Sequence, residues 1–358
     1  MKIKYLGIVS LILLILLTAF TLSYMGNVSR VSETGARTGH SSYTLPISQR
    51  SFYIGLTPTP KNWPNSSFED IMAAYEETGK IAEVAMVWVE KQGIGEFEVL
   101  KQNKVITALK VYGLKPVITF NFATIKIGSS GIEYVIDSPK EISGNISNPE
   151  FRSRWVKEAK DIALEFKPDY FSLGNEVNDY FYFHPQDFSS FLNLFDEAKR
   201  EIKSVSPDTK VFVTLSYNHL IENSQWNMVE ELDSHVDLIG LTTYPWKHYK
   251  SPEEIPADYY SRIKKYTTKP IAFTEIGWTS SPPSSEKLQS QFLIRFLEIT
   301  RDLKIEMVNW LFLHEIQLKG YIEKISSPET GTIALKRTDG TEKDIYSLWL
   351  DLKELKRA

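Results

Sequence analysis

The sequence contains no cysteine, and this absence excludes several kinds of chemistry at once. Without thiols the chain cannot form disulfides, thiolate zinc sites, iron–sulfur clusters or a cysteine nucleophile. Its six histidines are scattered, without the H-x-H or HExxH spacing of common metal sites. A glycine-rich dinucleotide motif and a P-loop are also absent. We therefore expect no metal and no cofactor, and ordinary side chains must carry any chemistry.

The sequence also lacks a large excess of one charge sign. It has 41 Lys and Arg residues against 45 Asp and Glu residues, a net charge of −4. Residues 1–50 hold five basic residues and one acidic residue, a net of +4, so residues 51–358 carry −8. An acidic body repels polyanions, which argues against a nucleic-acid partner and favours a neutral ligand.

One long hydrophobic run stands at the N-terminus. No charge occurs between Lys4 and Arg30, and the stretch from Leu6 to Leu22 is almost entirely aliphatic. Because such a run can span a bilayer, residues 1–25 are interpreted as a signal peptide or as an uncleaved membrane anchor. Residues 26–50 are rich in Ser, Thr and Gly, as in a flexible linker. Both alternatives predict an extracellular protein, either secreted or anchored to the outer face of the membrane by this single helix.

Residues 51–358 alternate short apolar runs with longer amphipathic stretches, which predicts βαβ units around a parallel sheet. Eight such units favour a (β/α)8 TIM barrel, with a doubly wound sheet as the competing fold. Asp187 and Ser284 are plausible caps of two of the helices. The predicted strands are Phe52–Leu56, Ala82–Trp88, Lys115–Asn121, Tyr170–Asn175, Lys210–Leu215, Val236–Thr243, Pro270–Glu275 and Met307–Phe312.

Three further segments complete the expected domain. Residues 128–144 are interpreted as a loop after the third strand. Asp339-Gly340 predicts a tight hairpin turn between the pieces TIALKR and TEKDI. A final helix is expected over about Tyr346–Leu355.

Two glutamates follow predicted strands, where barrels of this kind hold their chemistry. Glu176 comes directly after the fourth strand in YFSLGNEVND, and Glu275 closes the seventh in PIAFTEIGW. An ionised glutamate rarely ends an apolar strand without a partner or a function. Paired carboxylates are what hydrolysis of a glycosidic bond requires, one as proton donor and one as anion facing the anomeric carbon. We expect both side chains in one cleft.

These motifs carry a resemblance. Asn175-Glu176 after strand four, with Glu275 ending strand seven, resembles the retaining glycoside hydrolases of clan A. The pieces GLTTYPWKHY and FTEIGW are similar to the endo-β-1,4-galactanase family and its relatives. The resemblance implies that Glu176 is the acid/base and Glu275 the nucleophile. It further implies that Asn175 binds the sugar 2-hydroxyl, that Tyr244 orients the nucleophile and that Trp310 floors the subsite of the reacting sugar.

Aromatic residues are abundant, with 8 Trp, 18 Tyr and 19 Phe, and many follow predicted strands. Flat rings suit pyranose faces, so these positions predict a sugar-binding surface. Trp246, Trp278 and Trp88 are the further ring candidates, and Asn121 after strand three is a candidate polar support. Trp155 and Trp349 lie in helical patterns and are expected to be packing residues. His314 is expected on the surface or behind the site.

The second strand departs from the clan pattern. Many clan members have an arginine near its end, whereas AEVAMVWVE offers Trp88 and no arginine. The sequence therefore leaves two functions open. The first is a retaining β-glycosidase, expected to be endo-acting on a polysaccharide or oligosaccharide. The alternative is a membrane-tethered carbohydrate-binding protein on a catalytically inactive barrel.

Overall fold

The computed structural model describes residues 43–358, apart from residues 88, 90, 129–130, 320–322 and 325. The predicted hydrophobic segment and most of the predicted linker lie outside the described residues. Within them, no helix combines the length and apolar character needed to cross a membrane. Residues 43–50, predicted as linker, pack on the domain. Leu45 and Ile47 lie against the core, and buried Arg50 pairs with Glu83 at 2.6 Å.

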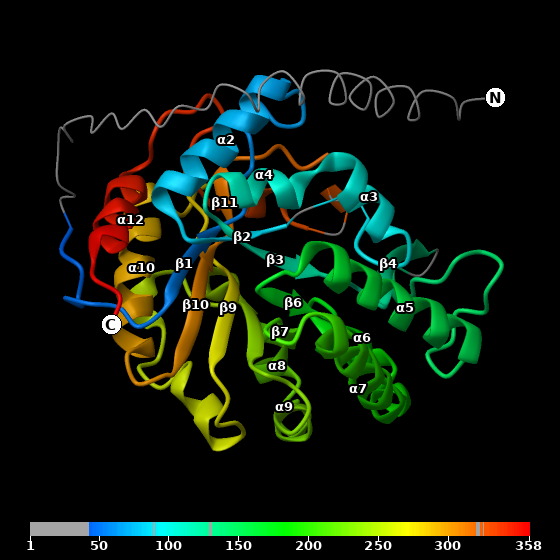
Figure 1. Ribbon diagram of the computed structural model, residues 1–358. Coiled ribbons are helices and arrows are strands. Elements are labelled where there is room, and N and C mark those ends of the chain that lie inside the picture. Colours follow the sequence, from blue (N-terminus) through cyan, green and yellow to red (C-terminus); the bar gives the residue numbers. More distant parts are fainter. Residues whose placement is uncertain (1–42, 88, 90, 129–130, 320–322, 325) are drawn as a thin grey trace.

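Eight parallel strands close into a barrel in the order β1, β2, β3, β6, β7, β8, β9, β10 (Figure 1). The predicted TIM barrel is therefore confirmed, and each predicted strand overlaps an observed one, although the eighth begins and ends earlier than predicted and the second and fourth are shorter. The barrel strands are β1 (Tyr53–Leu56), β2 (Val84–Met86), β3 (Lys115–Thr119), β6 (Tyr170–Ser172), β7 (Lys210–Ser216), β8 (Ile239–Thr243), β9 (Ile271–Ile276) and β10 (Ile305–Trp310).

Helices surround the barrel on its outside (Figure 1). Helix α2 begins with a capping box of Ser67 and Asp70, and Asn148 caps α5 ahead of a proline at its first position. The cap of α10 is Ser285 and not the predicted Ser284, while Asp187 precedes α7 without a side-chain cap hydrogen bond. The helices are α2 (Phe68–Ile81), α3 (Glu96–Asn103), α4 (Val105–Val111), α5 (Pro149–Phe166), α6 (Val177–Phe183), α7 (Phe188–Val205), α8 (Tyr217–Glu222), α9 (Trp226–Asp233), α10 (Glu286–Thr300) and α12 (Asp344–Glu354).

The crossover from β8 to β9 breaks the alternation of strand and α-helix. Residues 244–270 are all described, and they contain only the 3₁₀ turns η2 (Pro245–Lys247), η3 (Pro252–Glu254) and η4 (Ser261–Lys265). Prolines at the first position of η2 and η3 and a further proline at 256 keep this segment from propagating as an α-helix. Tyr260 of this segment is fully buried and packs against Phe273 of β9 and Phe296 of α10.

Two small two-stranded sheets lie outside the barrel. The segment predicted as a loop after strand three begins as an antiparallel hairpin of β4 (Ala123–Gly128) and β5 (Gly131–Ile136), which corrects that prediction. After β10, strands β11 (Phe312–His314) and β12 (Ala334–Lys336) pair in parallel, with η5 (Pro328–Thr332) between them. The predicted turn at Asp339-Gly340 is confirmed, because Lys336 bridges Glu342 in antiparallel register.

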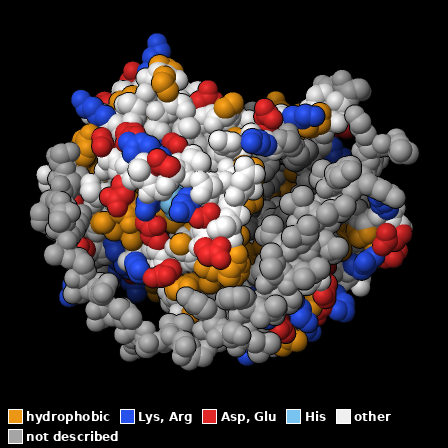
Figure 2. Space-filling model, turned by 90° about the horizontal axis from the view of Figure 1, so that it is seen from above, with side chains coloured by type: hydrophobic (Ala, Val, Ile, Leu, Met, Phe, Trp, Pro, Cys, Tyr) orange, Lys and Arg blue, Asp and Glu red, His pale blue; other side chains and the backbone are white. Residues whose placement is uncertain are grey.

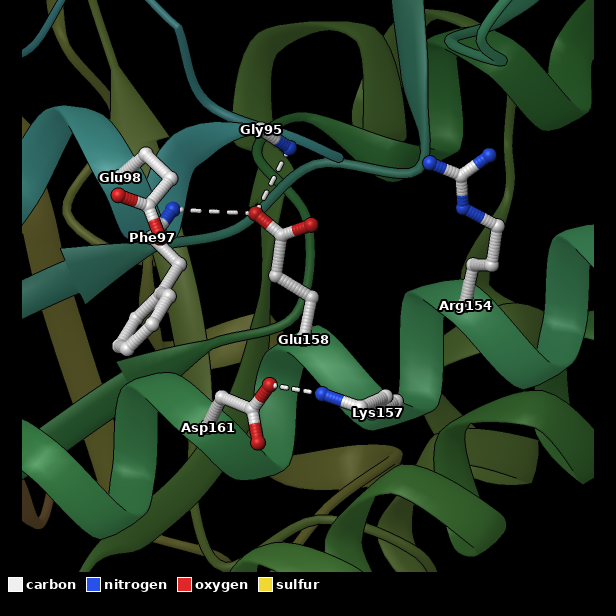
Figure 3. Close-up of a pocket in the computed structure, with 7 residues that line it drawn as sticks. All are labelled: Gly95, Phe97, Glu98, Arg154, Lys157, Glu158 and Asp161. Atoms are coloured by element: carbon white, nitrogen blue, oxygen red, sulfur yellow. Dashed lines mark hydrogen bonds and ion pairs between the residues drawn. The ribbon is translucent and has the colours of Figure 1, made fainter.

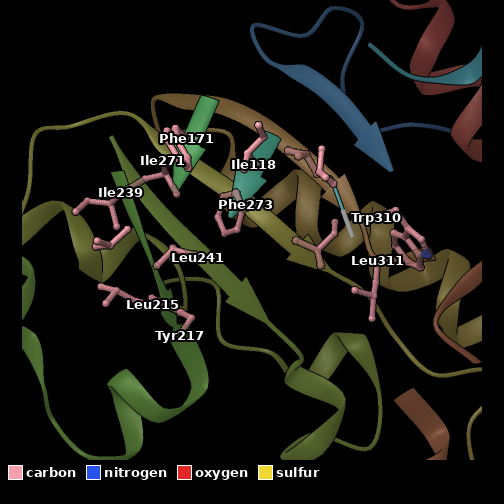
Figure 4. Packing of buried hydrophobic residues seen from close by; sticks show 14 of the residues in the cluster. Ile118, Phe171, Leu215, Tyr217, Ile239, Leu241, Ile271, Phe273, Trp310 and Leu311 are labelled. Atoms are coloured by element: carbon pink, nitrogen blue, oxygen red, sulfur yellow. The ribbon is translucent and has the colours of Figure 1, made fainter. Parts of the chain in front are cut away.

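The core has two parts. Along β2, Val84 and Met86 belong to a small cluster inside the barrel, whereas Ala85 between them packs in the larger cluster under the helices. Residues of the larger cluster converge between strands and helices in Figure 4. The inner cluster consists of Val84, Met86, Val117, Tyr170, Phe212, Leu238, Ala272 and Met307. The barrel is therefore a packed scaffold, and chemistry must lie at its mouth.

The surface seen from above in Figure 2 mixes acidic and basic side chains on the described residues. No broad patch of one sign is visible among them on that face. This pattern agrees with the absence of a polyanion-binding signature in the sequence.

Candidate active site

Glu176 lies in the turn after β6, directly before α6, in a strained backbone conformation. Its φ of 50° and ψ of 41° are left-handed, which is uncommon for a residue other than glycine. Gly174, two residues earlier, also has a positive φ of 131°. Thr242 at the end of β8 donates a hydrogen bond to Glu176 Oε1 and holds the side chain across the mouth. Strain of this kind is retained where the surroundings fix it, and it often marks a functional site.

Glu275 lies near the end of β9, at an irregularity in the sheet. On the β8 side the register passes from Leu241 opposite Phe273 to Thr242 opposite Glu275, so one residue of β9 is extra. A bulge of this kind re-aims a side chain at a barrel rim. Because Thr242 contacts Glu176 and lies opposite Glu275, the two glutamates converge on one site, as the sequence predicted.

The two carboxyl groups sense each other electrostatically. Burial is the largest cause that raises the pKa of Glu275, and the charge of Glu176 is the next; together they bring it to about 7. Burial also raises the pKa of Glu176, with the charge of Asp179 as the second cause. Because burial and the neighbouring charge both disfavour the anionic form of Glu275, the pair resists ionisation of both carboxyl groups at once.

Hydrogen-bond donors distinguish the two groups. The Tyr244 hydroxyl donates to Glu275 Oε2, and the Asn175 side chain also lowers the pKa of Glu275. Glu176 has the single hydroxyl donor Thr242. Burial and the charge of Glu275 keep the pKa of Tyr244 well above its usual value, so this hydroxyl stays a donor. The donors from Tyr244 and Asn175 stabilise the ionised form of Glu275, while Thr242 and the charges of Lys247 and His219 stabilise that of Glu176.

Asparagines hold the residues around this pair. Asn218 clamps the Tyr244 backbone: its Oδ1 accepts from Tyr244 N at 2.9 Å and its Nδ2 donates to Tyr244 O at 3.3 Å. Asn121 Oδ1 accepts from Asn175 N at 2.8 Å, and Asn121 Nδ2 donates to Gln92 Oε1 at 3.4 Å. The predicted residue Asn121 therefore lies behind Asn175, whose own Oδ1 has no hydrogen-bond partner among the described residues.

A second charged pair lies beside Glu176. His219 Nδ1 is 2.8 Å from Asp179 Oδ1, and this contact raises the pKa of His219. Asp179 N also donates to Glu176 O at 2.9 Å, which ties the pair to the turn that carries Glu176. Sequence analysis missed Asp179, His219, Thr242 and Asn218. Thr242 lies at the end of β8, and Asn218 and His219 follow β7, so their positions at strand ends could have found them; Asp179 lies within α6 and has no such signal.

The predicted aromatic surface needs correction. Trp310 is fully buried, with its ring between Phe292 of α10 and Trp349 of α12, so it does not floor a subsite. Trp278 is also buried, and its Nε1 donates to Ser284 Oγ at 2.9 Å. Both rings pack against Phe292 of α10. Figure 4 shows Trp310 among the buried residues of the larger cluster.

The other predicted tryptophans and His314 lie in different surroundings. Trp246 is partly exposed in η2 and packs against the core, whereas Trp88 lies outside the described residues. Trp155 and Trp349 are fully buried, which confirms them as packing residues. His314 is also buried, with Nδ1 at 2.8 Å from Thr59 O, so the expectation of a surface position was wrong.

A groove between α3 and α5 serves the fold (Figure 3). Glu158 Oε1 accepts from the backbone N–H groups of Gly95 and Phe97 and so caps the start of α3. Lys157 and Asp161 form an exposed ion pair along α5. The groove shares no residue with the surroundings of Glu176 and Glu275. In the described part of the chain, no three His, Asp or Glu side chains gather as metal ligands.

Comparisons with known proteins agree with this geometry. Residues 157–309, which include both glutamates, match the model of glycosyl hydrolase family 53. No curated protein matches the sequence. Solved structures share the fold at low identity. The exo-β-1,4-mannosidase Op5Man5 from Opitutaceae bacterium strain TAV5 has a TM-score of 0.65 and 13% identity; the match covers 85% of this chain and 59% of that one.

Two further structures extend the comparison. A GH5_18 protein from Streptomyces cattleya, solved in complex with Manβ1-4GlcNAc, has a TM-score of 0.62 and 12% identity over 85% of this chain and 80% of that chain. A family 39 glycoside hydrolase from Bacteroides cellulosilyticus WH2 has a TM-score of 0.57 and 16% identity over 86% and 64%. The match of residues 157–309 to the family model, together with the closed barrel, confirms the predicted resemblance to the glycoside hydrolases of clan A, and to family 53 in particular.

Proposed function

We propose that this protein hydrolyses a β-glycosidic bond by double displacement, with Glu176 as acid/base and Glu275 as nucleophile. The observation that carries the proposal is the asymmetric carboxyl pair. Burial and the charge of Glu176 raise the pKa of Glu275 to about 7, while the donors from Tyr244 and Asn175 favour its ionised form. A retaining glycosidase needs one protonated and one ionised carboxyl at the same pH.

In the first step, a Glu275 carboxylate oxygen bonds to the anomeric carbon while the bond to the leaving oxygen breaks. Glu176 gives its proton to that oxygen, so the leaving group departs as a neutral alcohol. In the second step, Glu176 takes a proton from water, the water oxygen bonds to the anomeric carbon, and Glu275 leaves as a carboxylate. Asn175, with a free amide oxygen beside Glu275, is suited to bind the sugar 2-hydroxyl.

The proposed substrate is a neutral β-linked polysaccharide or oligosaccharide, cut internally. The net charge of −8 on residues 51–358 supports a neutral chain over a polyanion. The match to family 53 supports endo action, as the galactanase resemblance implies. A reducing-sugar screen over galactans, mannans, xylans and β-glucans would identify the sugar, and a protein that binds one of them without cleaving any would instead be the inactive-barrel alternative.

Glu176→Gln and Glu275→Gln test the roles directly. Each variant should abolish hydrolysis of the substrate that the wild type cleaves. Its Tm should equal or exceed that of the wild type. Glu298→Gln on α10 is the matched control, since this carboxylate is exposed and pairs only with neighbouring Arg295. Wild-type rates in both active-site variants would refute the assignment.

We further propose that the N-terminal segment exports the protein and holds it at the outer face of the membrane. The uncharged run behind two lysines supports this location. The full-length chain should sediment with membranes, and a chain that begins at Tyr43 should be soluble and equally active, because the contacts of Arg50 remain intact. A full-length protein found in the soluble cytoplasmic fraction would refute the proposal.

A further inference from the structure

Exposed aromatic side chains gather at the end of α6, the helix that Glu176 immediately precedes. Tyr182 and Phe183 at the end of α6 are 54% and 57% exposed, although large apolar side chains are usually covered. Tyr134 of β5 stacks on Phe183 with a centroid distance of 5.5 Å and an angle of 18°, and Tyr182 meets Phe183 edge-on at 5.1 Å. We call Tyr134, Tyr182 and Phe183 the aromatic shelf. Helix α6 and the β4–β5 hairpin lie on the right-hand side of Figure 1.

The shelf is fixed from below by polar contacts. The Tyr134 hydroxyl donates to Asp179 Oδ2 at 3.5 Å, and His184 Nε2 lies 2.9 Å from Tyr134 O. Asp179 in turn contacts His219. The rings are therefore held at a set orientation, with carboxylate and imidazole groups along one edge. Flat apolar faces bordered by polar groups match a pyranose, which has an apolar face and a hydroxyl rim.

The aromatic shelf is close to Glu176 along the chain. Glu176 immediately precedes α6, and the seven residues of this helix rise about 10 Å to Phe183. Tyr134 contacts Asp179, whose charge acts on Glu176. The shelf therefore extends from the Glu176 side of the site. An acid/base residue faces the leaving oxygen, so the sugars beyond that oxygen lie on its side.

We propose that the aromatic shelf binds sugar rings of the leaving-group portion of an oligosaccharide, one or more units beyond the bond that is cut. This inference rests on the proposed function, since it uses Glu176 as acid/base. Helix α6 makes the shelf continuous with the carboxyl pair, which favours a glycan chain over a protein partner. Such a subsite also suits internal cleavage, because it grips the chain downstream of the broken bond.

Phe183→Ala and Tyr182→Ala test the shelf, and their exposure means the fold should tolerate both changes. The substrate is an oligosaccharide of the polysaccharide that the wild type cleaves, labelled at its reducing end. Stacking interactions of this kind predict a fall in kcat/KM of about three- to tenfold for the oligosaccharide. For the dinitrophenyl glycoside of the same sugar, whose leaving group is too short to reach the shelf, kcat/KM should stay within twofold. Labelled products should become shorter, because fewer units are held on the leaving-group side.

Leu164→Ala on α5 is the control, because Leu164 is 54% exposed but lies outside the shelf. An unchanged product pattern in both shelf variants overturns the shelf while leaving the proposed function intact. Equal losses on the oligosaccharide and the dinitrophenyl glycoside also overturn it. If the variants instead change the oligomeric state by light scattering and leave the pattern unchanged, the shelf is a contact between copies. A wild-type protein that cleaves no glycoside refutes the proposed function itself.

Discussion

Removing the Tyr244 hydroxyl tests whether its hydrogen bond to Glu275 controls the ionisation of a catalytic carboxyl. In Tyr244→Phe the ring and its packing remain, and the Asn218 clamp holds the backbone in place. What disappears is the hydrogen bond from the hydroxyl to Glu275 Oε2. Hydrogen bonds to charged groups contribute roughly 1.5–3 kcal/mol. Losing this energy corresponds to a change of about one to two units in the pKa of Glu275. At low pH the ionised fraction of Glu275 would fall by about 10- to 150-fold.

The hydroxyl lowers the pKa of Glu275, so its loss should raise that pKa further. The acidic limb of the pH profile of kcat/KM should therefore move upward by about one to two units. Tyr170→Phe is the control, because its hydroxyl also donates to a carboxylate, Glu306 Oε1 at 2.6 Å, from the start of β6 at the opposite end of the barrel. That variant should lose stability without a shift in the profile. A Tyr244→Phe profile that superimposes on the wild type would refute the reasoning.

Three further predictions follow from contacts in and near the site. Asn218→Ala removes both hydrogen bonds to the Tyr244 backbone, so we expect a loss of about 1–3 kcal/mol in unfolding free energy and an acidic limb displaced in the same direction as in Tyr244→Phe; a stability loss with an unmoved limb would limit Asn218 to a structural role. In Glu176→Ala, the basic limb should disappear for a dinitrophenyl glycoside, whose departure needs no acid, because the proton lost at that limb is the one on Glu176, whose pKa burial raises; persistence of the limb would assign it to another group. Burial raises the pKa of Glu96 well above its usual value, so the folded state binds this proton more tightly and stability is lost as pH rises; Glu96→Gln should therefore raise the Tm more at about pH 8 than at about pH 5, and an equal change at both would contradict the assignment.

The barrel and its two glutamates could be predicted because their signals are local. Buried parallel strands appear as continuous apolar runs, and Glu176 and Glu275 stand next to such runs in the sequence. The crossover between β8 and β9 was less predictable, because 3₁₀ turns leave a polar and aromatic pattern without helical periodicity.

The direction of the tryptophan side chains could not be read from the sequence. Trp310 ends β10 next to Asn309, and in a strand a shift of one residue turns a side chain from one face to the other. Local register irregularities on both sides of β9 decide such details, and no sequence pattern marks them. Asn218 was missed for a different reason: its function depends on Tyr244, 26 residues away, so its role appears only in three dimensions.

The most direct test of the two-glutamate mechanism is the anomeric configuration of the first product. Proton NMR, recorded during early hydrolysis of a β-linked substrate that the wild type cleaves, resolves the two anomers before mutarotation mixes them. Double displacement through Glu275 predicts that the β-configuration is retained in the first-formed sugar. A first-formed α-anomer would mean direct attack by water, and would contradict the role of Glu275 as nucleophile.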